Sequence, residues 1–106
     1  MLNLKIQNDQ KIQLTLAPVT ASGKAAAVDG KPVWTVVDGD STVVVADDGL
    51  SAFLVSSDTA GTSHFSVSAD ADLGAGVETI SDTVELVVEN AKAVALGLTA
   101  GTPVAK

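Results

Sequence analysis

The sequence predicts an all-β fold, an antiparallel β-sandwich of about seven to eight short strands. Apolar and polar side chains alternate with a period of two residues through most of the chain, as they do in half-buried strands. Runs rich in Val, Thr and Ser are separated by turns that contain Asp and Gly, at a spacing of about ten residues. No segment carries a convincing helical period. The pattern therefore indicates an architecture more strongly than it indicates a chemistry.

Length and composition favour one core. The 106 residues match the commonest domain size, and the absence of Cys excludes disulfides and thiolate metal sites. Apolar residues make up 46% of the chain but aromatic residues only 3%, so Val, Leu, Ile and Ala must build most of the core. We expect two parts, an N-terminal strand or arm over residues 1–9 and a sandwich domain over residues 10–106.

Two half-buried strands, or one long bent strand, are expected at residues 2–6 and 12–16, where Leu and Ile alternate with polar residues. Pro18 then ends strand pairing because it has no N–H to donate. Residues 21–30 are rich in Ala, Gly, Ser and Asp, which is typical of a connection.

The middle of the chain predicts three further strands. Residues 33–37 carry Trp34 and are apolar on both faces, so this strand is expected to be covered on both sides. Residues 42–46 and 50–56 flank an Asp-Gly pair, Asp48-Gly49, which is a strong signal for a β-hairpin.

The last third of the chain predicts strands at residues 65–69 and 83–89, with residues 70–76 as a loop. Residues 94–98 form a final alternating run and an eighth strand candidate. Residues 90–98 are also the best helix candidate, although Gly97 weakens it. The side chains expected in the core are Leu16, Trp34, Leu54, Phe65, Val67, Val84 and Leu86.

Charge argues against two classes of partner. Thirteen acidic residues against six Lys give a net charge of −7, which repels phosphate backbones and anionic lipids. We therefore expect no nucleic-acid and no membrane partner. The first ten residues lack the apolar run of a signal peptide, and no stretch approaches the length of a membrane span.

Few residues offer chemistry. His64 is the only histidine and alternates with Phe65, so we expect it on the outer face of its strand, in solvent. The pairs Asp38/Asp40 and Asp70/Asp72 are candidate calcium ligands, because Ca²⁺ takes carboxylate oxygens from loops. Asp also stabilises turns by itself, and this is the favoured interpretation. We expect no catalytic residue and no cofactor.

Three stretches resemble the bacterial immunoglobulin-like (Big-type) domains. They are Val33-Trp34-Thr35 with the Asp turn after it, the step at residues 48–52, and Ala60-Gly61-Thr62 leading into residues 65–70. The resemblance covers residues 10–89. Residues 70–77 and 98–103 also resemble small immunoglobulin-like proteins that are encoded beside phage structural genes.

The resemblance implies a non-enzymatic structural module that decorates a phage capsid or tail and is located in the virion after synthesis in the host cytoplasm. The alternative is a carbohydrate- or host-surface-binding adhesion domain, calcium-assisted, on a bacterial surface within a larger chain. Expected partners are phage capsid or tail proteins. Residues 1–6 and 94–98 both show apolar alternation outside the resembling region. One of them is expected to pack on another subunit or on the shell of the assembly, and so to give a homo-oligomer or an arm that becomes ordered on docking.

Overall fold

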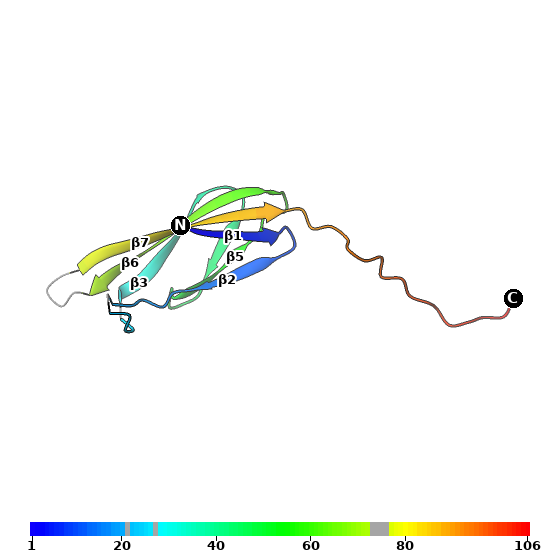
Figure 1. Cartoon of the computed structure of the whole chain (residues 1–106), viewed down its shortest axis with the longest axis horizontal. Coiled ribbons are helices and arrows are strands. Elements are labelled where there is room, and N and C mark those ends of the chain that lie inside the picture. The colour runs from blue at the N-terminus through cyan, green and yellow to red at the C-terminus, as the bar shows by residue number, and fades with distance from the viewer. Residues whose placement is uncertain (21, 27, 73–76) are drawn as a thin grey trace.

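The computed structural model describes residues 1–20, 22–26, 28–72 and 77–106, and these residues form seven strands and no helix. No helix that is long and apolar enough to cross a membrane occurs among them. The strands form two facing sheets, so the prediction of an all-β sandwich is confirmed (Figure 1). They are β1 (Leu2–Gln7), β2 (Lys11–Thr15), β3 (Val28–Asp38), β4 (Thr42–Val45), β5 (Ser51–Val55), β6 (Gly61–Asp72) and β7 (Val77–Glu89).

One sheet has the order β1-β7-β6-β3 and the other the order β2-β5-β4. Placing β3, β6 and β7 opposite β2, β5 and β4 is the arrangement of an immunoglobulin-like sandwich, with β1 lying beside the last strand. The pairing of β1 with β7 is parallel, while the other pairs are antiparallel. Among the described strands the sandwich is therefore antiparallel as expected, apart from this one edge pair.

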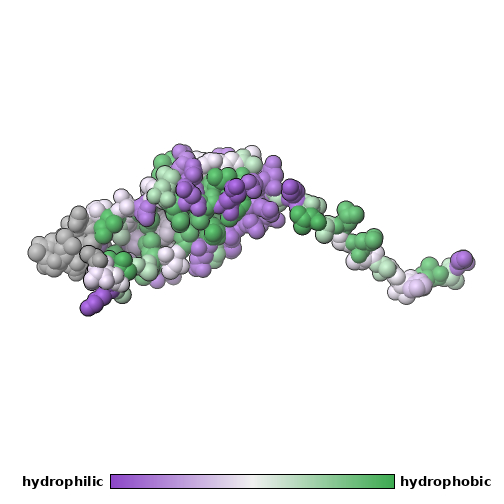
Figure 2. All heavy atoms as spheres, viewed as in Figure 1, coloured by the Kyte–Doolittle hydropathy of each residue, from purple (hydrophilic) through white to green (hydrophobic). Residues whose placement is uncertain are grey.

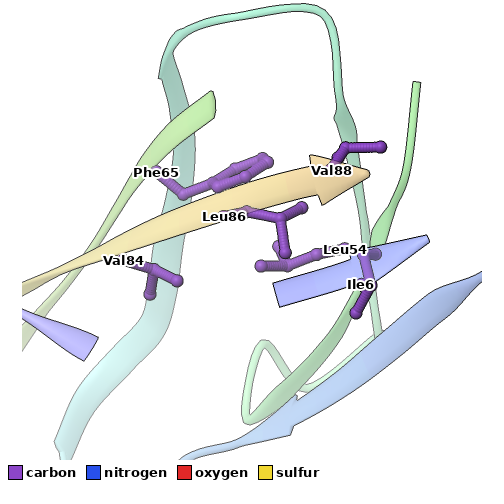
Figure 3. Close-up of a cluster of buried hydrophobic side chains, with 6 residues drawn as sticks. All are labelled: Ile6, Leu54, Phe65, Val84, Leu86 and Val88. Atoms are coloured by element: carbon purple, nitrogen blue, oxygen red, sulfur yellow. The ribbon is translucent and has the colours of Figure 1, made fainter. Parts of the chain in front are cut away.

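The core is the space between the two sheets. Alternation along β6 and β7 turns Phe65, Val84 and Leu86 inward, where they meet Leu54 from β5 (Figure 3). Phe65, Leu54 and Leu86 are the largest fully buried side chains. Val67 and Val84 are buried too, so five of the seven expected core residues are confirmed.

The other two expected core residues, Trp34 and Leu16, are only partly buried. Both line a hollow at one end of the sandwich, where the sheets are not closed by other side chains. The indole Nε1 of Trp34 donates a hydrogen bond of 2.9 Å to the carbonyl oxygen of Gly49. Trp34 therefore connects β3 to the β4–β5 turn by a hydrogen bond and is not the centre of the core.

The two tight turns are built around glycines with positive φ. Gly49 (φ +72°) lies in the turn between β4 and β5, in the hairpin that the Asp-Gly pair predicted. Gly39 (φ +91°) follows β3, and a Cβ there would overlap Ser63. The buried Ser63 hydroxyl accepts a hydrogen bond from the backbone N–H of Ser41 at 3.2 Å. The β3–β4 turn is thus held against β6.

Three expectations about loops and ends need correction. β6 runs to Asp72, so residues 70–72 belong to a strand and not to the expected loop, because they pair with residues 77–79. Residues 73–76 of that loop and residues 21 and 27 of the expected connection lie outside the described residues. Residues 94–98 form neither the eighth strand nor the helix, because no neighbouring strand pairs with their backbone and Gly97 has φ +66°.

The two ends of the chain differ. Of the alternatives for residues 1–9, a strand or an arm, the structure has a strand, β1, at the edge of the four-stranded sheet. Residues 90–106, here called the arm, instead leave the sandwich at the end of β7 and extend away from it (Figure 1). The backbone N–H of Ala91 donates to the side-chain oxygen of Asn8 at 2.9 Å, which fixes the root of the arm.

Candidate functional site

The chemistry-bearing residues of the described chain meet at one row across the outer face of the four-stranded sheet. Strand register places Asp38 of β3 opposite His64 of β6, and His64 opposite Glu85 of β7. Phe65 and Val84 beside them point into the core, so the row faces outward, as expected for His64. The two carboxylates beside it were not expected. They lie 26 and 21 residues away along the chain, so only the strand pairing brings them together.

Both ring nitrogens of His64 face a carboxylate. Nδ1 lies 2.7 Å from Oδ1 of Asp38, and Nε2 lies 3.5 Å from Oε1 of Glu85. The pKa of His64 is raised above its ordinary value of 6.5, chiefly by the Asp38 hydrogen bond, and further by the negative charges of both acids against an opposing desolvation. The arrangement stabilises a charged imidazolium. It therefore links three strands electrostatically, and neither nitrogen points at a third group as a general base would.

The three calcium candidates whose side chains the structure describes do not converge. Asp38 and Asp40 lie at the β3–β4 turn, whereas Asp70 lies six residues beyond His64 on β6, about 20 Å along the strand. Asp70 accepts a hydrogen bond from the hydroxyl of Thr79 at 2.8 Å. The side chain of Asp72 lies outside the described part of the structure. Within that part, no group of three His, Cys, Asp or Glu residues is placed to hold a metal ion.

An apolar groove opens at one end of the sandwich. β1 begins opposite Val84, so on that side residues 77–83 of β7 have no strand beside them in the described chain. The groove beside this open edge has a volume of about 360 Å³, and an adjoining hollow of about 180 Å³ continues it toward Leu2 and Trp34. The groove is lined by Leu16, Ala17, Pro18, Val19, Val28, Val67, Ser68, Ala69, Ile80, Ser81 and Asp82.

The arm carries the most exposed large apolar side chains of the described residues. Val94, Leu96 and Leu98 are 90%, 98% and 94% exposed, and Figure 2 shows groups of hydrophobic residues at intervals along the projection. Lys92 and Lys106 are its only charged side chains. The sequence had indicated apolar alternation here, but it did not indicate that the segment stands clear of the sandwich.

Comparison with known proteins adds information on the fold. No family model matches the sequence, and no curated protein matches it. Among solved structures, a nucleoside hydrolase-related hypothetical protein from Saccharophagus degradans, described as associated with carbohydrate metabolism, is similar with a TM-score of 0.59 and 11% identity. The match covers 83% of this chain and 22% of the other, so this chain spans about a fifth of that protein's length. At this identity the likeness concerns the fold alone.

Proposed function

We propose that this chain is a non-enzymatic structural module, an immunoglobulin-like decoration protein of a phage capsid or tail. The arm is the observation that carries the proposal. The sandwich has its own buried core, and the seventeen residues of the arm extend from it with their Val and Leu side chains 88% or more exposed. Such a segment is suited to attach one building block to another.

The energetics of the arm favour assembly. Covering a Val or Leu side chain contributes about 1.5–3 kcal/mol relative to leaving it in water. Val94, Leu96 and Leu98 contribute none of this to the isolated domain, because all three are exposed. The corresponding free energy is available only when the arm lies against another surface.

The resemblance to phage immunoglobulin-like proteins supports the virion as the place of assembly. The alternative, binding of carbohydrate or of a host surface, would require polar groups arranged for a hydrated ligand. The groove beside β7 is instead lined mainly by apolar side chains such as Leu16, Val67 and Ile80. Exposed apolar surface of this kind is typical of protein interaction sites, which favours a protein segment as its occupant.

Quantitative mass spectrometry of purified phage particles from the source tests this proposal. Cleavage after Lys releases two convenient peptides, residues 12–24 and residues 93–106. We expect both to sediment with the particles in a density gradient, at a fixed ratio to the major capsid protein across the fractions. An abundant host protein of similar size serves as the contamination control, and its ratio to the major capsid protein should decrease in the particle fractions. Recovery of the two peptides only from the unassembled fractions would refute the proposal.

A further inference from the structure

We infer that the arm of one copy docks as an added strand into the open end of a second copy. The acceptor, here called the β7 slot, consists of the open edge of β7 at residues 77–83 and the apolar groove beside it. The inference rests on the proposed function in one respect, that the arm is the assembly element. It goes further by naming what the arm binds.

The β7 slot offers both backbone and side-chain partners. The residues of β7 before Val84 pair with β6 on one side, and on the other side their N–H and C=O groups face no strand of the described chain. The alternation that turns Val84 and Leu86 inward also places Ile80 and Asp82 on the inner face. Ile80 is nevertheless 58% exposed. An added strand would satisfy the backbone groups and cover this apolar surface.

The arm has the pattern that such a strand needs. As an extended segment it carries Lys92, Val94, Leu96 and Leu98 on one face, while Ala and Gly occupy the alternate positions. The face with the large side chains fits the apolar groove. The face with Ala and Gly leaves room for other parts of the acceptor to pack closely against the arm. Gly97 now has φ +66°, and glycine reaches the extended region without a steric penalty.

Val94 and Leu96 of the arm cannot reach Ile80 in the slot of their own domain. Leu96 lies seven residues after Glu89, so the chain spans at most about 25 Å between them. Ile80 lies nine residues before Glu89 on an extended strand, about 31 Å away. β1 also occupies the path beside β7 from Val84 to Glu89. An acceptor that holds Val94 and Leu96 against Ile80 therefore belongs to another molecule.

Charge makes a second copy a suitable acceptor. The arm holds two of the six Lys residues and no acid, whereas residues 1–89 hold four Lys and thirteen acids, a net charge of −9. Lys92 lies on the same face of the arm as Val94, and Asp82 lies on the inner face of the slot. The cationic arm thus enters an anionic domain at an acidic residue.

One arm and one slot on each copy give a head-to-tail contact. Such a contact is heterologous, so it produces a ring when the rotation between copies closes and an open chain when it does not. A symmetric pair that exchanges two arms is also consistent with this contact, since each molecule then donates and accepts once.

Light scattering on the full chain tests the inference. We expect the average mass to rise with concentration above the 10.6 kDa of one chain, from micromolar to millimolar protein. Leu96→Asp on the arm and Ile80→Lys in the slot should each hold the mass at one chain. The matched controls are Val104→Asp, exposed on the same arm but outside the alternating run, and Val33→Lys, 59% exposed at the edge strand β3. Both controls should assemble as the unaltered chain does.

Mixing the two defective variants gives the sharpest test. The Leu96→Asp chain keeps an intact slot and the Ile80→Lys chain keeps an intact arm, so the mixture should form a 1:1 dimer of twice 10.6 kDa and nothing larger. A mixture that stays monomeric overturns the inference, as does an unaltered chain that is monomeric at every concentration. Thermal melts of the Ile80→Lys variant and of Ile80→Ser check that the slot side remains folded.

The two proposals fail separately. A chain that assembles through the slot but is absent from phage particles would retain the inference and lose the proposed function. A chain that is present in particles but never self-associates would retain the proposed function and lose the inference.

Discussion

His64 shows how the sheet creates an electrostatic contact that no local segment contains. The imidazole bridges Asp38 and Glu85 across three strands, and its pKa is raised as a result. The alternation of polar and apolar side chains along β6 predicts by itself that His64 lies on the outer face. Finding its partners required the register of β3 with β6 and of β6 with β7, which depends on long-range pairing.

This contact predicts a pH dependence of stability. A raised folded-state pKa means that the stabilisation from His64 is fully present below its unfolded value of 6.5 and is lost as the pH rises through the folded value. The difference in unfolding free energy between the unaltered chain and His64→Gln should therefore shrink as the pH rises from 6.5 through the higher folded-state pKa. Denaturant melts at several pH values measure it. Asp38→Asn removes the main cause of the shift and should flatten the profile, and a difference that stays constant in the unaltered background contradicts the assignment.

Gly39 is the residue at which side-chain volume matters most for a turn. Its φ of +91° disfavours any other residue, and a Cβ would overlap Ser63. Gly39→Ala should destabilise the fold by about 3 kcal/mol, from backbone strain together with overpacking. Gly30→Ala is the matched control, because φ is +77° but no atom lies within 4 Å of the added carbon. We expect about 1 kcal/mol there. Equal losses in urea melts would show that the contact with Ser63 has no effect.

At the scale of elements, the signal for each strand lies within a few residues of sequence, whereas the signal for which strands pair does not. The alternating runs and the Asp48-Gly49 turn locate β2, β4 and β5 and the hairpin between the last two, because side-chain period and turn chemistry act over a few residues. The parallel pairing of β1 with β7 joins the two extremes of the domain and has no local signal. The alternation of residues 94–98 predicts a strand but does not say whether the domain has an edge for it.

The burial of core side chains predicts which substitutions lower the free energy of unfolding most. Phe65 is fully buried between the sheets, so Phe65→Ala should cost about 3–5 kcal/mol. Trp34 is only partly buried at the end of the sandwich, so Trp34→Ala should cost less, about 2 kcal/mol, including the lost hydrogen bond to Gly49. Calorimetry or denaturant melts of both variants check this order. A larger loss at Trp34 would place the centre of the core at β3.

At the scale of the molecule, the domain and the arm are physically different. The radius of gyration is 20.3 Å and the longest extent is 84 Å, whereas a compact chain of this length has a radius of about 13 Å. The excess comes from the arm, which stands clear of the sandwich (Figure 1). Nearly all acidic charge lies on the domain, and the arm is apolar and cationic. This division gives the molecule one part that folds by itself and one part that gains from contact with another.

Protease protection of the arm in assembled particles tests the central claim most directly. In dilute protein the exposed bond after Lys92 should be cut rapidly by trypsin, releasing residues 93–106. In purified phage particles we expect the chain to be present and this peptide to be released at least tenfold more slowly, because the arm is then covered. Cleavage of Lys24, which is exposed outside the arm and the slot, provides the control for access of the protease. Particles that lack the chain, or that release the peptide as fast as dilute protein does, would contradict the account.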